Sequence, residues 1–189
     1  MMASFDFGIS NRGTLIAPII ALSLGACGAP SVAEGSAMEI SSTAFGQNEM
    51  IPVEFTCDGA NRSPPLQWTD PPEGTRSLAL IVDDPDAPSG TFRHWGVYDL
   101  AESRRRLDEG IGDRQATDFR QAQNDFGNAG YGGPCPPRGN GPHHYRFRLL
   151  ALDVAKLEAG TNPTVAQVFE SAKPHLLGSG VLTGLYERR

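Results

Sequence analysis

Short apolar stretches separated by turns run along the chain from residue 38 to its end. Most alternate apolar and polar residues with the period of two that is typical of half-buried strands, and residues 78–82 form a continuous apolar run. The strands that this pattern predicts are 38–42, 53–55, 66–68, 78–82, 97–100, 144–150 and 180–186. Strands this short and this regularly punctuated predict a mainly β fold, an antiparallel β-sandwich.

Two stretches depart from the strand pattern. Residues 164–177 carry apolar residues at helical spacing, so we expect one short C-terminal helix with Thr164 as its N-cap and Pro174 ending or kinking it. Residues 101–128 lack apolar periodicity and mix arginines with carboxylates, which predicts a long exposed connection. Its run of three arginines at 104–106 could be a docking patch, although a solvated face is the simpler interpretation.

The N-terminal stretch is of a different kind. Residues 14–26 are apolar or small and precede Cys27; they are too short to span a bilayer but fit the apolar region of a signal peptide. Residues 24–27, Leu-Gly-Ala-Cys, resemble the lipobox of bacterial lipoproteins, in which the cysteine is lipidated. We therefore expect a signal peptide over 1–26, an anchor at Cys27, a tether over 27–37 and a domain over 38–189, held at the extracytoplasmic face of the bacterial envelope. The alternative is ordinary cleavage near Ala26 or Ala33 with a soluble product.

Composition sets the bounds on domain number and partner. The 189 residues are 39% hydrophobic and 20% charged, which fits one globular domain with a sizeable core. Fifteen prolines and twenty-two glycines favour many turns over a helical bundle. The formal net charge of −6 gives no support to a nucleic-acid surface, and an anionic ligand would need a local positive site.

A first polar cluster lies between the predicted strands 78–82 and 97–100. Residues 83–95 hold three carboxylates, two prolines, an arginine, a histidine and a tryptophan, and the prolines stiffen the turn. On its own this stretch could equally be a solvated surface turn. A second cluster over 128–145 favours a functional interpretation, because its glycines permit positive φ angles and expose backbone amides. The strand period then places His143 and Tyr145 toward the core and His144 toward solvent.

Together these stretches resemble the phosphatidylethanolamine-binding protein family, and most closely its bacterial branch, often labelled Raf kinase inhibitor-like. The residues that carry the resemblance are Asp84-Pro85-Asp86-Ala87-Pro88, His94-Trp95, Gly133-Pro134-Cys135-Pro136-Pro137-Arg138-Gly139 and His143-His144-Tyr145. The resemblance extends from about residue 39 to residue 186. It implies an antiparallel β-sandwich with a small anion pocket at one end, and a cis bond between Asp84 and Pro85. The pocket residues that it implies are Asp84, Asp86, His94, His143 and Tyr145, beside the proline loop at Pro136.

The chemistry of these residues fits a phosphate-bearing small molecule or lipid head group. Imidazolium, a tyrosine hydroxyl and backbone amides of a glycine-rich loop are donors that a phosphate accepts from. A carboxylate beside a histidine fixes its tautomer and orients it, and could also meet the ammonium of an ethanolamine group. The hypothesis is that Asp84 or Asp86 orients His94 or His143, which then contacts the phosphate.

Other classes of function remain open at this point. Phosphate-ester hydrolysis by Asp and His is the enzymatic alternative, but Ser89 and Thr91 lie in no nucleophile-elbow pattern and no zinc-ligand spacing occurs. We therefore expect a binding protein, with no catalytic residue, metal or cofactor. Inhibition of an envelope protease or kinase through the 101–128 loop is a third class. Asp99, where the family commonly has asparagine, and the short C-terminal end put that inhibition in doubt.

Two cysteines remain after Cys27. Cys57 and Cys135 lie beside turns or prolines that flank the expected pocket, and an exported protein meets an oxidising compartment. We expect a disulfide between them, with two free thiols as the alternative. Exposed strand edges could pair with a second copy, which leaves a homodimer open.

Overall fold

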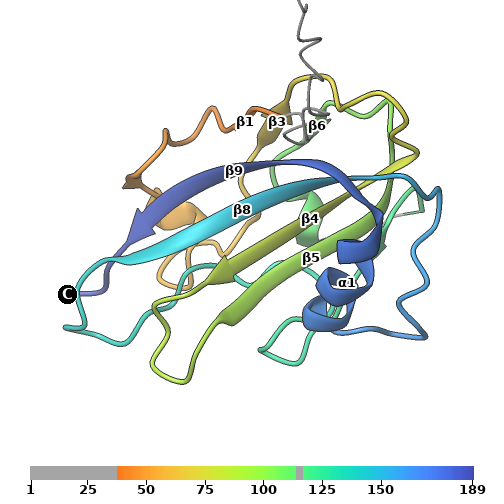
Figure 1. Cartoon of the computed structure of the whole chain (residues 1–189). Coiled ribbons are helices and arrows are strands. Elements are labelled where there is room, and N and C mark those ends of the chain that lie inside the picture. Colours follow the sequence, from red (N-terminus) through yellow and green to blue (C-terminus); the bar gives the residue numbers. More distant parts are fainter. Residues whose placement is uncertain (1–37, 114–116) are drawn as a thin grey trace, which may run out of the picture. The chain divides into compact units, whose positions relative to one another are not determined.

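The computed structural model describes residues 38–113 and 117–189, so the expected signal peptide, Cys27 and the tether lie outside the described residues. Two sheets form the domain (Figure 1). The small sheet has the order β1-β3-β6, and the large sheet has the order β2-β9-β8-β4-β5-β7. The mainly β prediction is confirmed.

Most neighbouring strands in the two sheets are antiparallel; the exception is the parallel pair β2–β9. The strands of the small sheet are β1 (Ile40–Ser41), β3 (Leu66–Trp68) and β6 (Arg106–Leu107). The strands of the large sheet are β2 (Glu49–Met50), β4 (Ser77–Asp84), β5 (Phe92–Ala101), β7 (Arg120–Gln121), β8 (His143–Leu152) and β9 (Leu176–Tyr186).

The large sheet is covered on both faces, which explains the continuous apolar run of its central strand. One face of β4, with Leu80 and Val82, packs in the core that the large sheet shares with the small sheet. The other face, with Ala79 and Ile81, packs with helix α1 (Val165–Ala172). Every residue of β4 is buried as a result. A strand buried on both faces cannot alternate, because neither face is open to polar side chains.

Helix α1 begins and ends close to where the sequence predicts. The Thr164 hydroxyl accepts a hydrogen bond from the Gln167 backbone N–H, and the Gln167 side chain accepts one from the Thr164 backbone N–H. This reciprocal pair satisfies two of the free donors at a helix start. Pro174 falls in a short 3₁₀ turn, η3 (Lys173–His175), that ends the helix and leads into β9.

Three expectations about local structure need correction. Residues Val53–Phe55 form the 3₁₀ helix η1 instead of a strand, because Pro52 fixes the entry and the next N–H groups bond three residues back. The 101–128 stretch is more than an exposed connection: it holds β6, η2 (Ile111–Asp113), β7 and the buried ring of Phe119. No cis peptide bond occurs among the described residues, so the expected cis bond before Pro85 is wrong.

Candidate functional site

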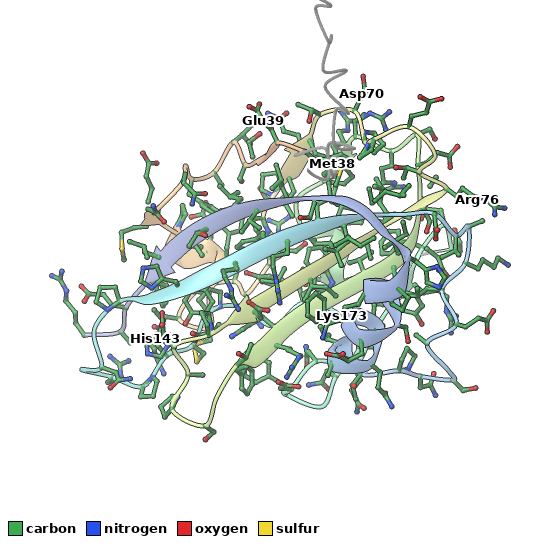
Figure 2. The ribbon with its side chains drawn as sticks, viewed as in Figure 1. Met38, Glu39, Asp70, Arg76, His143 and Lys173 are labelled. Atoms are coloured by element: carbon green, nitrogen blue, oxygen red, sulfur yellow. A yellow bond between two sulfur atoms is a disulfide. The ribbon has the colours of Figure 1, made fainter. Side chains whose placement is uncertain are left out.

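A small pocket lies where β4 ends and where β5 and β8 begin. Figure 2 shows His143 at this end of the large sheet, whereas α1 covers the other end (Figure 1). The pocket has a volume of about 190 Å³. Its lining comes from β4, the 85–91 turn, β5, Phe126, the proline loop and β8: Asp84, Ala87, Pro88, Phe92, His94, Phe126, Cys135, Pro136, Pro137 and His143. Residues from the two predicted polar clusters therefore meet in one place.

Asp84 and His143 form a buried pair in the wall of this pocket. Nδ1 of His143 lies 2.7 Å from Oδ2 of Asp84, and the two side chains are only 3% and 4% exposed. The other oxygen of Asp84 accepts a hydrogen bond from the backbone N–H of Asp86 at 2.8 Å. On the far side of the ring, Nδ2 of Asn140 lies 3.1 Å from Nε2 of His143. The carboxylate therefore fixes which ring nitrogen carries a proton and how the imidazole is oriented.

His94 reaches the pocket because β5 is irregular at this point. The pairing of β4 with β5 shifts between Val82 opposite Trp95 and Asp83 opposite Arg93, so His94 is the extra residue on β5. Two successive residues, His94 and Trp95, are consequently both buried. Bulges of this kind redirect a side chain, and they occur often beside functional sites.

The His94 ring is neutral in its surroundings. Its Nδ1 lies 2.8 Å from the carbonyl oxygen of Gly132, to which it donates a hydrogen bond. Burial lowers the pKa of His94, and this outweighs the opposing effects of the Gly132 carbonyl and the Asp84 carboxylate. The neutral ring therefore has Nε2 as an acceptor, and it becomes a second donor only when a proton is added.

Tyr145 packs edge-on against His94, with ring centres 5.2 Å apart. Its side chain is fully buried, and its hydroxyl lies close to the Asp84 carboxylate and the Cys135 backbone without a hydrogen bond of ordinary length to either. Burial raises the pKa of Tyr145, and the nearby Asp84 carboxylate raises it further, so the phenol keeps its proton. Tyr145 is not among the residues that line the pocket, so its protonated hydroxyl lies beneath the lining, close to Asp84.

Asp86 lies outside this pocket lining. Its Oδ2 accepts a hydrogen bond from the backbone N–H of His144 at 2.8 Å and lies 2.7 Å from Nδ1 of the exposed His144 ring. Burial acts to raise the pKa of Asp86, but the hydrogen bonds from His144 outweigh it and leave this pKa below its ordinary value. Asp86 thus fastens the 85–91 turn to the start of β8, while Asp84 alone pairs with a pocket histidine. The predicted orientation of His143 toward the core and His144 toward solvent is confirmed.

The disulfide between Cys57 and Cys135 is present and holds the proline loop against the segment after η1. Pro136, the next residue, is buried and lines the pocket.

The glycine-rich stretch contributes fewer donors than the sequence suggests. The N–H of Gly132 donates to the His94 carbonyl, and the N–H of Gly133 donates to Oδ1 of Asn61. The candidate donors for an anion are therefore the two imidazoles of the lining, and each offers a further N–H only when a proton is added to its Nε2.

The polar lining of the pocket carries little positive charge. Asp84 is its acidic residue, and none of the described residues in the lining is Lys or Arg. Within 38–113 and 117–189, no group of three or more His, Cys, Asp or Glu side chains is arranged to hold a metal ion. The part of the chain that the structure describes also has no helix long and apolar enough to cross a membrane.

Sequence reasoning missed three neighbours of the site. Phe92 stands two residues before His94 on β5, a spacing that could have indicated a shared face. Phe126 and Asn140 come from loops whose paths no sequence pattern specifies. Asp83, although part of the first cluster, faces the other side of the sheet, where its fully buried carboxylate pairs with Arg146 and Arg148.

The family follows from comparison with known proteins. The sequence profile of the phosphatidylethanolamine-binding protein family matches residues 41–187. The UPF0098 protein of Aquifex aeolicus is 45% identical over 157 residues, which cover 82% of this chain and 92% of that protein. LppC of Mycobacterium tuberculosis, a protein named as a lipoprotein, is 39% identical over 150 residues, which cover 79% of this chain and 72% of that one.

A solved structure gives the same answer at the level of the fold. The crystal structure of Escherichia coli YbcL, described as a member of the mammalian PEBP family, superposes with a TM-score of 0.77 at 34% identity. The match covers 82% of this chain and 100% of YbcL. The chain belongs to the phosphatidylethanolamine-binding protein family.

Proposed function

We propose that the protein binds phosphate or phosphoethanolamine-type groups in the pocket formed around Asp84, His94 and His143. The observation that carries the proposal is the buried pair of Asp84 and His143 in the wall of a pocket that His94 also lines. Burying such polar groups has a cost in stability that a ligand offsets. A zwitterionic head group fits this set, because its phosphate can accept from the His94 ring once that ring takes up a proton, while its ammonium balances Asp84.

Heteronuclear NMR of the purified protein tests the proposal. Phosphoethanolamine, inorganic phosphate and ethanolamine are titrated separately, and we expect the phosphate-bearing ligands to shift residues 84–95 and 133–145. Two adjacent histidines provide a matched pair of variants. His143→Ala should abolish the shifts, because it removes the imidazole that Asp84 holds in the pocket, whereas His144→Ala should preserve them, because that ring is exposed.

Absence of shifts at millimolar phosphate or phosphoethanolamine in the unmodified protein would refute a phosphate pocket. Equal loss of binding in both variants would also contradict the assignment, since His143 lines the pocket and His144 does not. Stronger binding of ethanolamine than of phosphate would show that Asp84 alone determines the ligand, and the site would then be one for ammonium groups.

We also propose that the chain is exported and held at the envelope membrane through a lipid on Cys27. The support is the apolar stretch followed by Leu-Gly-Ala-Cys at residues 24–27 and the naming of the related LppC as a lipoprotein. Mass spectrometry of protein from membranes of an expressing bacterium should show a chain that begins at Cys27 and carries acyl groups. Cys27→Ala should move the protein into the soluble fraction; a membrane-bound variant would contradict the anchor.

A further inference from the structure

A second pocket lies directly beside the first. Apart from Phe126, none of the residues that line it has been discussed so far as a ligand contact. Its volume is about 310 Å³. Its lining comes from the segment after η1 and from the loop between β7 and the proline loop: Cys57, Asn61, Asn124, Phe126, Asn128, Tyr131, Gly132 and Gly133. We call it the amide pocket, because three of these side chains are carboxamides.

The two pockets share one wall. Phe126 lines both, and its side chain is among the few large apolar side chains that are exposed, at 46%. Its ring contacts Phe92 and His94, with centres 4.7 and 5.5 Å away. The disulfide also joins them, because Cys135 lines the first pocket and Cys57 lines the amide pocket. The two pockets are therefore adjacent, with Phe126 and the disulfide between them.

The lining of the amide pocket selects an uncharged polar group. None of the described residues that form it is charged, so an ionic group would gain no partner there. Asn124 is already used within the protein: its amide donates to Gly130, and its Oδ1 accepts from the N–H groups of Phe126 and Asn128. Its role is to hold the loop that carries Phe126.

The other two carboxamides keep hydrogen-bonding capacity for a ligand. Oδ1 of Asn61 accepts from the N–H of Gly133, and its NH₂ group makes no hydrogen bond within the described residues. Nδ2 of Asn128 donates to the Phe126 carbonyl at 3.4 Å, while its Oδ1 likewise makes no hydrogen bond there. One free donor and one free acceptor beside an aromatic ring suit vicinal hydroxyl groups, which both donate and accept and which present C–H faces to the ring.

We infer that the amide pocket binds the polyhydroxyl part of a phosphoester, a glycerol or sugar unit, whose phosphate occupies the pocket at Asp84 and His143. The inference rests on the proposed function and deepens it, because it names the alcohol that the phosphate is esterified to. Phe126 separates the two subsites and packs against the carbon chain that joins them. The ligand class is a phosphate ester of a polyol, which a phospholipid head group and a free sugar phosphate can each supply.

The test compares five probes by NMR and calorimetry: inorganic phosphate, phosphoethanolamine, glycerol phosphate, glucose phosphate and free glycerol. The side-chain NH₂ signals of Asn61 and Asn128 report on the amide pocket directly. We expect both polyol phosphates to shift these signals and to bind about tenfold more tightly than inorganic phosphate, as two added hydrogen bonds allow. Tighter binding of glycerol phosphate indicates a lipid-derived ligand, and tighter binding of glucose phosphate indicates a free sugar phosphate.

Variants separate the two subsites. Asn128→Ala, which removes the free carboxamide oxygen but no hydrogen bond of the proline loop, should reduce the affinity for polyol phosphates toward that for inorganic phosphate and leave the latter unchanged. Gln67→Ala, which removes an exposed carboxamide on β3, serves as the matched control and should change nothing.

The outcomes distinguish failure of the inference from failure of the proposed function. If phosphate binds but a polyol adds no affinity and leaves the asparagine signals unmoved, the amide pocket is not a subsite, and the proposed function stands. If no phosphate probe binds, the proposed function fails. In that case free glycerol at high concentration tests whether the amide pocket binds a polyol without a phosphate. Shifts at Asn61 and Asn128 support polyol binding there, and their absence overturns it.

Discussion

Tyr145 holds its hydroxyl in the interior without a hydrogen bond of ordinary length, beside the carboxylate of Asp84. A buried unpaired hydroxyl has a cost of about 1–3 kcal/mol, so its removal should stabilise the free protein. We predict that Tyr145→Phe raises the free energy of unfolding by about 1 kcal/mol. We also predict that it changes phosphate affinity by less than about twofold, because Tyr145 does not line the pocket. Urea unfolding and calorimetry of the same two proteins measure both quantities.

Tyr131 is the matched control, because it is another buried tyrosine whose hydroxyl is paired. It donates to the Phe55 carbonyl at 2.8 Å, so Tyr131→Phe removes a hydrogen bond and leaves that carbonyl unsatisfied. This variant should lose about 1 kcal/mol of stability and keep its phosphate affinity. Equal destabilisation by both substitutions would show that the Tyr145 hydroxyl is paired in solution.

The sequence predicts the position of a side chain correctly where the strand period determines that position. It fails where the position depends on the path of a loop. The alternation of β8 correctly separates the buried His143 from the exposed His144. The pairing of Asp84 with His143, and of Asp86 with His144, depends on how the 85–91 turn folds back on β8, which no local pattern specifies. The burial of His94 next to Trp95 breaks the period of two through a bulge, so alternation alone could not place both inward.

At the scale of elements, the disulfide joins two loops that are 78 residues apart in sequence. Closing a loop of this length restricts the unfolded chain, so the bond should contribute about 2–4 kcal/mol to stability. We predict that the double variant Cys57→Ala, Cys135→Ala unfolds at a lower urea concentration with that loss of free energy. The backbone amide of Arg138 should also give a broadened NMR signal, because the proline loop that carries it loses its covalent tie.

The disulfide prediction has a direct counter-result. An unchanged unfolding midpoint in the double variant would mean that the hydrogen bond from the Cys57 N–H to the Pro134 carbonyl, and the contacts around it, hold the loop without the bond. Replacing only Cys27 is the control, since that residue lies outside the described domain and should leave the unfolding free energy unchanged.

Elements with strong periodicity are predicted better than short ones. The strands β4 and β8 and helix α1 carry their signal in several residues each, and the sequence locates them, whereas β5 begins at Phe92, five residues before the predicted strand 97–100. Strands of two residues, such as β2 and β7, carry no usable period and are fixed by their neighbours in the sheet. The 3₁₀ turn η1 looks like a strand because Val53, Glu54 and Phe55 alternate in polarity, while local hydrogen bonds determine the backbone.

At the scale of the whole molecule, an acidic protein offers an anion a pocket whose described lining has no Lys or Arg. Bound anion therefore needs a compensating proton, and His94 is a group that can take one. Burial keeps the pKa of His94 below 6.5 in the free protein, although the carboxylates of Asp84 and Asp125 oppose this. An anion beside the ring favours its charged form, so the pKa of His94 is higher in the complex than in the free protein.

Two pH effects of opposite sign follow from this one group. In the free protein the folded state binds fewer protons than the unfolded state, so stability contributed by neutral His94 is present above pH 6.5 and is lost as the pH falls toward the lowered pKa. In the same range an anion binds together with a proton, so its affinity rises as the pH falls, by up to about tenfold per pH unit for one proton. Sulfate is the suitable probe, because its charge does not change over this range.

We predict that sulfate raises the melting temperature more at acidic than at neutral pH, while the free protein becomes less stable on acidification. Calorimetry in buffers of different ionisation enthalpy should record proton uptake on binding. His94→Gln, which cannot titrate, should remove this part of the pH dependence from both stability and affinity. A sulfate affinity that does not vary with pH would mean that no proton is taken up, and it would contradict the role of His94 in binding the anion.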